Sequence, residues 1–218
     1  MGKPRPQKIK PYKQSILIIC PGEIEQGYVR SLKDDKYRGL SISIEPRLGK
    51  ADDFDKVLKR LEKEYSVAEP RTCFYLNDMD AIIAQGKLDK YQIARSKELK
   101  ASKGKLRIIE SMPCIEFWFL LHYLYTTKCY PSYDSIKSDV RRKIPGYDKN
   151  EAWANKIYAT IKDNTDTAIA NAKKVMSVKN SGEGACSYTN MHELLEQLDE
   201  IMRMRLVLQE IPNFCYQF

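Results

Sequence analysis

Apolar runs alternate with helix-like segments through the first half of the chain. Residues 16–19 read Ile-Leu-Ile-Ile inside a strand predicted over 15–20, and such a run is typical of a strand buried on both faces. The pattern predicts further strands at 40–45, 71–78 and 106–110, with helices at about 25–33, 52–65 and 88–102 between them. Strands separated by helices predict an α/β domain with a parallel sheet.

From Pro113 onward the pattern is helical. Proline is tolerated in the first turn of a helix, so residues 111–113 are interpreted as a helix entry. The segment 114–123 is apolar around nearly its whole circumference, which predicts a buried helix in which Glu116 and His122 stand out. Further helices are predicted at 132–143, 152–162, 166–178 and 190–210. We therefore divide the chain into a basic arm (1–14), an α/β domain (15–125) and a helical annex packed on it (126–218).

Composition and cysteine use indicate a soluble globular protein. The chain has 218 residues, of which 43% are hydrophobic and 30% charged, and its first 14 residues contain no apolar core. We therefore expect a cytoplasmic protein without a membrane span. The six cysteines are far apart, so we expect buried reduced thiols, and with two histidines a zinc site is disfavoured.

The net charge of +8 suggests a polyanionic partner such as nucleic acid. Basic clusters occur around residues 97–107 and 137–143, and the candidate contacts are Lys97, Lys100, Lys103, Arg141 and Arg142. Lysine runs on helix faces are also common as plain solvated surface, so charge alone leaves both interpretations open.

Acidic residues follow two of the predicted strands. Asp78 and Asp80 end an apolar strand, and side chains two apart on an extended segment point the same way, toward one hard divalent cation. Glu23 and Glu25 follow the first strand after a glycine turn. If these strands are neighbours, the carboxylates converge on one crevice suited to Mg²⁺ or Mn²⁺, with Asp78, Asp80 and Glu25 as ligands. The alternative is that Asp78 and Asp80 open a solvated loop.

Five ordered motifs resemble a known family. Residues 20–28 (CPGEIEQGY) are similar to C-E-G-E-x-E-x-x-Y, 78–80 (DMD) to D-x-D, and 111–123 (SMPCIEFWFLLHY) to S-N-P-C-F-E-x-W-L-L-L-H-F. Residues 146–149 (GYDK) and 187–192 (SYTNMH) resemble G-Y-x-K and P-S-T-x-V-H elements. The chain resembles the RloB family, whose members carry a Toprim-type metal-binding domain and are found in bacterial restriction and abortive-infection loci.

This resemblance implies a Toprim-like, Rossmann-like sheet flanked by helices. It also implies a nuclease that uses Mg²⁺ or Mn²⁺, and an AAA-type ATPase partner from the same locus. The chain departs from the pattern at Pro21, where Toprim domains carry a glutamate, so the proton-transfer role must fall to Glu23 or Glu25 or be lost. Glu25 matches a second acidic position of the related overcoming-lysogenization-defect nucleases. Met112 also replaces the asparagine of the family.

Several residues keep two interpretations. Glu116 is a catalytic candidate or a structural residue near the helix dipole, and His122 is most simply a core histidine. Tyr147 and Lys149 are candidates for phosphate binding or belong to a solvated loop.

Three functions fit these observations. The first is a metal-dependent nuclease, which the D-x-D motif and the basic surface favour. The second is a catalytically degenerate Toprim protein that binds nucleic acid or nucleotide, which Pro21 favours. The third is an interaction subunit of an ATPase complex.

Overall fold

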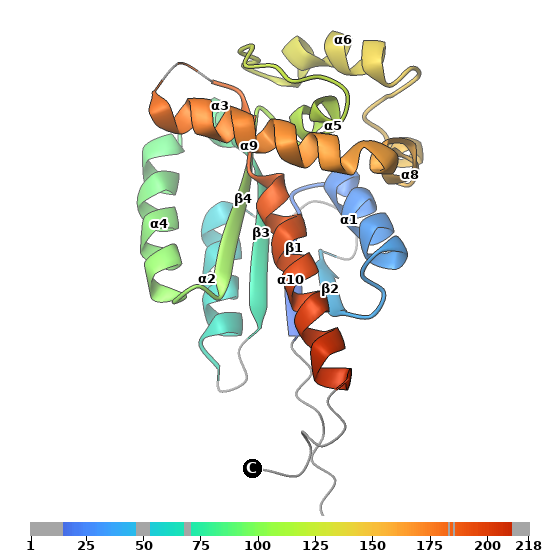
Figure 1. The fold of residues 1–218 in the computed structure, drawn as a ribbon. Coiled ribbons are helices and arrows are strands. Elements are labelled where there is room, and N and C mark those ends of the chain that lie inside the picture. The colour runs from blue at the N-terminus through green and yellow to red at the C-terminus, as the bar shows by residue number, and fades with distance from the viewer. Residues whose placement is uncertain (1–14, 47–52, 68–70, 183, 185, 211–218) are drawn as a thin grey trace, which may run out of the picture.

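The central sheet has five strands in the order β2-β1-β3-β4-β5. The structure is a computed structural model that describes residues 15–46, 53–67, 71–182, 184 and 186–210 (Figure 1). The strands are β1 (Ser15–Ile19), β2 (Ser41–Glu45), β3 (Thr72–Asp78), β4 (Leu106–Met112) and β5 (Tyr188–Thr189). The first four are parallel and β5 is antiparallel to β4. This arrangement confirms the predicted Rossmann-like α/β fold, while the basic arm predicted at 1–14 lies outside the described residues.

Helices connect and cover the strands. Those of the first half are α1 (Glu23–Asp35), α2 (Phe54–Tyr65), α3 (Met79–Ala84) and α4 (Leu88–Ala101). After β4 come α5 (Glu116–Leu121), α6 (Tyr133–Lys143), α7 (Glu151–Ala154), α8 (Ile157–Ile161), the 3₁₀ turn η1 (Lys162–Asn164), α9 (Thr165–Ser181) and α10 (Met191–Glu210). In Figure 1, α9 lies across the top of the sheet and α10 runs down its front, where they pack against β5 and β4.

Alternation along the strands builds a hydrophobic core on each face of the sheet. In β1, Ile16 and Ile18 face one core, and Leu17 and Ile19 face the other. The first core is covered by α1 and by the helices after residue 113, and the second by α2, α3 and α4. Burial on both faces explains why β1 is a continuous apolar run.

Glycine at position 27 permits the close packing of α1 on α7. A Cβ atom at Gly27 would lie 2.2 Å from the backbone oxygen of Ala154, far inside van der Waals contact. The helical region after residue 126 is therefore in direct backbone contact with the first helix of the α/β region.

The structure corrects four local predictions. Residues 111–113 do not begin a helix, because Met112 ends β4, the Met112–Pro113 peptide is cis and α5 begins at Glu116. The helix predicted at 152–162 is divided into α7, α8 and η1, and the short elements α3 and β5 were not predicted. The apolar helix itself is confirmed, since every residue of α5 is buried.

Candidate functional site

The candidate site lies at the carboxyl ends of β1 and β3. These strands are neighbours, as the sequence analysis required, with Ile19 paired to Tyr75. Asp78 is the last residue of β3, and Glu25 lies in the first turn of α1 just after β1. The carboxyl ends of parallel strands are where α/β proteins bind ligands.

Glu25 and Asp78 form a pair of neighbouring buried carboxyl groups. Asp78 Oδ1 also accepts a hydrogen bond from the backbone N–H of Ile115, at 3.1 Å. Burial raises the pKa of Asp78 well above its usual range, and the nearby Glu25 raises it further. Burial likewise raises the pKa of Glu25, with Lys149 opposing the shift and Glu116 adding to it. Glu25 therefore disfavours the ionised form of Asp78.

Gly22 gives Glu25 room to turn toward the strand end. Gly22 is the N-cap of α1, and a Cβ atom there would lie 3.0 Å from Glu25 Oε2. A larger residue at position 22 would press on this carboxylate. The glycine of the first motif therefore has a steric role in the placement of Glu25.

Glu116 supplies a third carboxylate from the first turn of α5. It is completely buried and accepts a hydrogen bond from the hydroxyl of Tyr147, at 2.9 Å. The ammonium of Lys149 lies 3.3 Å from the same carboxylate. Tyr147 and Lys149 follow α6, so the helical region closes the site over the strand ends.

Lys149 is the cation of this cluster. Its side chain is 36% exposed, and its ammonium lies 4.9 Å from the ring centre of Tyr133. Burial lowers the pKa of Lys149, but Glu116, Cys114, Asp78 and Glu25 together leave that pKa above its ordinary value. One ammonium therefore faces the carboxyl groups of Glu25, Asp78 and Glu116. The solvated-loop interpretation of Tyr147 and Lys149 is wrong, because both side chains contact a buried carboxylate.

Asp80 does not lie beside Asp78 on an extended segment. The strand ends at Asp78, and Asp80 is in the first turn of α3, so the geometry predicted for the D-x-D motif is wrong. Asp80 is partly buried, and burial raises its pKa while Lys149 lowers it. Asp80 therefore lies near enough to Lys149 and Glu116 for their charges to shift its pKa.

Glu23 and Pro21 contribute less than the motif suggests. Glu23 is the first residue of α1 and is exposed, whereas Glu25 two residues later is 3% exposed. Pro21 is partly buried between β1 and α1 and brings no titratable group. Of the two glutamates after β1, Glu25 is the one in the cluster.

The donor chemistry of the cluster fits Mg²⁺ or Mn²⁺. Carboxylate oxygens are hard donors. A divalent cation would offset the repulsion between neighbouring carboxyl groups. Among the described residues, however, no group of three or more His, Cys, Asp and Glu side chains is already arranged to hold a metal ion. Glu25 and Asp78 are the residues that would hold one.

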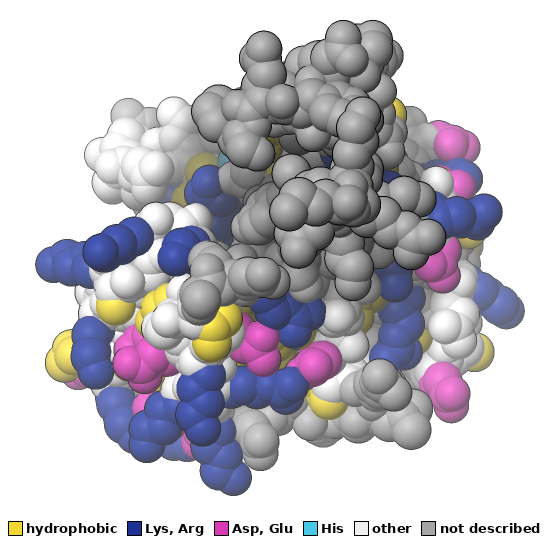
Figure 2. Space-filling model, turned by 90° about the horizontal axis from the view of Figure 1, so that it is seen from below, with side chains coloured by type: hydrophobic (Ala, Val, Ile, Leu, Met, Phe, Trp, Pro, Cys, Tyr) yellow, Lys and Arg dark blue, Asp and Glu magenta, His cyan; other side chains and the backbone are white. Residues whose placement is uncertain are grey.

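Two groups of basic candidates lie in different places. Lys97, Lys100 and Lys103 are exposed at the end of α4, which leads directly into the start of β4. They therefore lie near the amino-terminal ends of the strands, on the opposite side of the molecule from the carboxyl ends. Figure 2 shows this end from below, and Lys and Arg side chains gather on the side of α2 and α4 with Asp and Glu among them.

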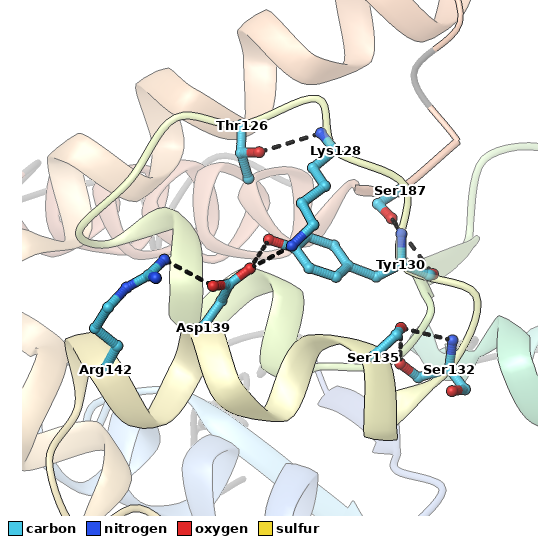
Figure 3. Close-up of polar contacts among 8 residues, drawn as sticks. All are labelled: Thr126, Lys128, Tyr130, Ser132, Ser135, Asp139, Arg142 and Ser187. Atoms are coloured by element: carbon cyan, nitrogen blue, oxygen red, sulfur yellow. Dashed lines mark hydrogen bonds and ion pairs between the residues drawn. The ribbon is translucent and has the colours of Figure 1, made fainter.

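Arg141 and Arg142 are on α6, nearer to Lys149. Arg141 donates to the backbone oxygen of Tyr147 at 3.0 Å and to Asp148 at 2.7 Å. Arg142 donates to Asp139 at 2.7 Å (Figure 3). Both guanidinium groups are exposed and engaged in local structure, and their role in nucleic-acid binding stays a prediction.

The remaining candidates are structural or corrected. His122 is 1% exposed, with Nδ1 at 2.9 Å from the backbone oxygen of Trp118, as the core interpretation expects. Cys20, Cys73 and Cys114 are buried free thiols, but Cys129 and Cys186 are exposed and form a disulfide. The prediction that all cysteines are buried and reduced is therefore wrong, because the fold brings these two distant loops together. Cys215 lies outside the described residues.

The Glu116–Tyr147–Lys149 grouping was missed by sequence reasoning. The sequence separation from Glu116 is 31 residues to Tyr147 and 33 residues to Lys149. The signal was present in the G-Y-x-K element, which carries a donor and a cation two residues apart. Periodicity gives no means of pairing that element with a buried glutamate.

Comparisons with known proteins give one match. A family model described as RloB-like protein matches residues 16–198. Neither the curated proteins nor the solved structures contain a significant match. In the part of the chain that the structure describes, no helix has the length and apolar character needed to cross a membrane.

Proposed function

Because this chain belongs to the RloB-like protein family, we propose that it is a Toprim-type nuclease dependent on a divalent metal ion. It would act on DNA or RNA in bacterial anti-phage defence. The observation that carries this proposal is the carboxyl pair of Glu25 and Asp78 at the ends of neighbouring strands, with Glu116 and Lys149 beside it.

The residues of the cluster divide the work. Mg²⁺ or Mn²⁺, when bound, would supply a Lewis acid and a water of lowered pKa. Glu25 and Asp78 would offer oxygens to that ion, and Glu25 is the proposed proton acceptor. Glu116 is a positioning residue, because it accepts hydrogen bonds from Tyr147 and Lys149 and holds both side chains in place. Lys149 keeps a positive charge near the place where a phosphate would lie.

Metal-dependent cleavage tests the proposal. Mixed DNA and RNA substrates with Mg²⁺ or Mn²⁺ should be cut, and Asp78→Asn should reduce the rate by about 100-fold or more. The matched control is Asp89→Asn, which changes an exposed aspartate of α4 and should leave the rate unchanged. Calorimetric titration should show saturable metal binding that Asp78→Asn removes. Unchanged metal affinity in Asp78→Asn would contradict the assignment of the site.

Pro21→Glu tests how far catalysis depends on the missing glutamate. A carboxylate at position 21 would add a proton acceptor near the strand end, so metal-dependent cleavage should rise about tenfold or more. Glu25→Gln and Glu23→Gln then identify the native proton acceptor. We expect Glu25→Gln to lower the rate and exposed Glu23→Gln to have little effect.

The second candidate is a protein that binds nucleic acid or nucleotide without cutting it. Two observations favour it: Pro21 stands where Toprim domains carry glutamate, and Lys149 already balances Glu116. Metal-independent binding without cleavage, unchanged by Pro21→Glu under all metals and substrates, would replace the nuclease by this function.

An AAA-type ATPase from the same locus is the proposed protein partner. The test is co-purification of the natively expressed protein with such an ATPase, followed by cleavage assays with the partner present and absent. Cleavage that needs the partner would identify an ATPase-controlled nuclease, and an inert complex would favour an interaction subunit.

A further inference from the structure

Two exposed cysteines face each other across loops far apart in the chain. Cys129 lies between α5 and α6, and Cys186 lies between α9 and β5. Their Cα atoms are 5.2 Å apart, within the range that a disulfide requires, and the two sulfurs are bonded. The sequence separation is 57 residues, so only the fold makes them neighbours.

The residues next to the cysteines hold the two loops together by themselves. The backbone N–H of Tyr130 donates to Ser187 Oγ at 2.7 Å, and both residues are buried. This contact does not depend on the sulfur bond. The two thiols would therefore stay adjacent after reduction, which favours rapid re-formation of the disulfide.

Tyr130 connects this junction to α6. Its hydroxyl donates to Asp139 Oδ2 at 2.5 Å, and Lys128 and Arg142 bind the same carboxylate (Figure 3). Hydrogen bonds from Tyr130 and Lys128 lower the pKa of Asp139, so the network is charged and tight. The first residue of α6 is Tyr133, whose ring centre lies 4.9 Å from the ammonium of Lys149.

We propose that Cys129 and Cys186 form a reversible redox latch that fixes the 122–132 loop and the start of α6 against β5. Exposed disulfides are the ones that small thiols reach and reduce, in contrast to buried structural bridges. The latch does not presuppose nuclease activity, because the observations behind it are the two loops and the Asp139 network.

The chemistry of the latch is thiol–disulfide exchange with a low-molecular-weight disulfide. One cysteine thiolate attacks a sulfur of the small disulfide, forming a mixed disulfide and releasing one small thiol. The second cysteine thiolate attacks the protein-bound sulfur and expels the other small thiol. Two protein thiols are oxidised to one disulfide, and one small disulfide is reduced to two thiols.

Thiol trapping tests whether the bond is reversible. The full chain is equilibrated in buffers of reduced and oxidised glutathione, trapped by alkylation after denaturation, and mapped by mass spectrometry. Cys129 and Cys186 should become protected together and be released together by reductant, in a Cys215→Ser background and in the unaltered chain alike. A bond that never forms, or that native protein keeps in excess reductant, overturns the latch.

Hydrogen exchange tests whether the bond acts on the loop. Amides of residues 122–140 should exchange about tenfold more slowly in the oxidised than in the reduced protein, because the bond removes local opening. Cys129→Ser and Cys186→Ser should each exchange at the reduced rate in both buffers. Equal exchange in oxidised and reduced wild-type protein would show a disulfide without a latch.

Discussion

At the scale of residues, the described part of the chain pairs the buried carboxylate of Glu116 with the ammonium of Lys149. Glu116 is fully buried, and the ammonium of Lys149 is its ionic partner. A buried charge that loses its partner is costly, whereas removing both partners together costs much less. The pair therefore ties the stability of the site to Lys149 as well as to any role in chemistry.

A double-mutant cycle measures that dependence. Lys149→Met should destabilise the protein by about 1–2 kcal/mol, less than for a fully buried pair because Lys149 is 36% exposed. In a Glu116→Gln background the same change should cost much less, since the buried charge is gone. Urea unfolding of the four proteins gives the coupling energy, and strictly additive effects would show that the ion pair contributes nothing.

His122 predicts a pH dependence of stability. Burial lowers its pKa to about 4, so the folded protein keeps the ring neutral while the unfolded chain takes up a proton below pH 6.5. The stability that the neutral, buried ring contributes is present above the unfolded pKa of about 6.5. It is lost as the pH falls from about 6.5 to 4, because the unfolded chain then binds a proton that the folded protein does not. From pH 7 to pH 5 the loss should be about 2 kcal/mol.

The check compares wild type with His122→Gln, which cannot titrate. Urea unfolding at pH 7 and pH 5 should give a smaller loss of stability for the variant, by about the same 2 kcal/mol. Equal losses in the two proteins would mean that His122 is solvated or charged in the folded state.

At the scale of elements, α1 and α7 pack so closely that their contact leaves no room for a side chain at position 27. Gly27→Ala places a Cβ atom against the backbone oxygen of Ala154, and backbone moves less readily than a side chain. We expect a loss of about 2 kcal/mol, in the range of other overpacked interiors. Gly39→Ala is the matched control, because its Cβ would meet the flexible ends of Met202, at 3.4 Å, and Arg205, at 3.8 Å, and no backbone.

The control should change stability by less than about 0.5 kcal/mol in the same denaturant experiment. Should Gly27→Ala unfold at the same urea concentration as wild type, the two helices must be able to separate without loss.

Elements with a strong pattern were predictable from the sequence, and those fixed by tertiary contact were not. The apolar run of β1, the helix at 52–65 and the apolar α5 were identified from the hydrophobic pattern alone. The helix α3 has only six residues, and β5 has two that pair with Ser111 and Met112, so neither leaves a periodic signal.

The candidate site was predictable to the same depth. Sheet order predicts that acidic residues after β1 and β3 meet, and the structure brings Glu25 and Asp78 together. The choice of Glu25 over Glu23 depends on which face of α1 is buried, and the Cys129–Cys186 pair depends on two loops. Neither the buried face of α1 nor the approach of the two loops can be predicted from a single sequence.

At the scale of the whole molecule, the two basic regions are expected to have separable effects. Replacing Lys97, Lys100 and Lys103 together with Ala should flatten the dependence of nucleic-acid affinity on salt. Fewer phosphate contacts would form, and fewer counterions would therefore be released on binding. The cleavage rate at saturating substrate should not change, since these lysines lie at the opposite edge of the sheet from Asp78.

Fluorescence anisotropy over a salt series and single-turnover cleavage provide the two readouts. Asp78→Asn should show the reverse behaviour, with slow cleavage and an ordinary salt slope. If the triple variant retains the wild-type slope, the lysines of α4 are solvated surface and binding is carried elsewhere.

The edge strand β5 covers β4 only after most of the chain has been synthesised. The backbone of Glu110 finds its partners in Asn190, which donates to it at 3.2 Å and accepts from it at 2.7 Å. During translation the ribosome must add some 80 further residues, the separation between these two positions, before that edge is covered. An uncovered edge offers itself to other chains. The outer edge of β4 therefore stays open to pairing with other chains until residues 188–190 have been made.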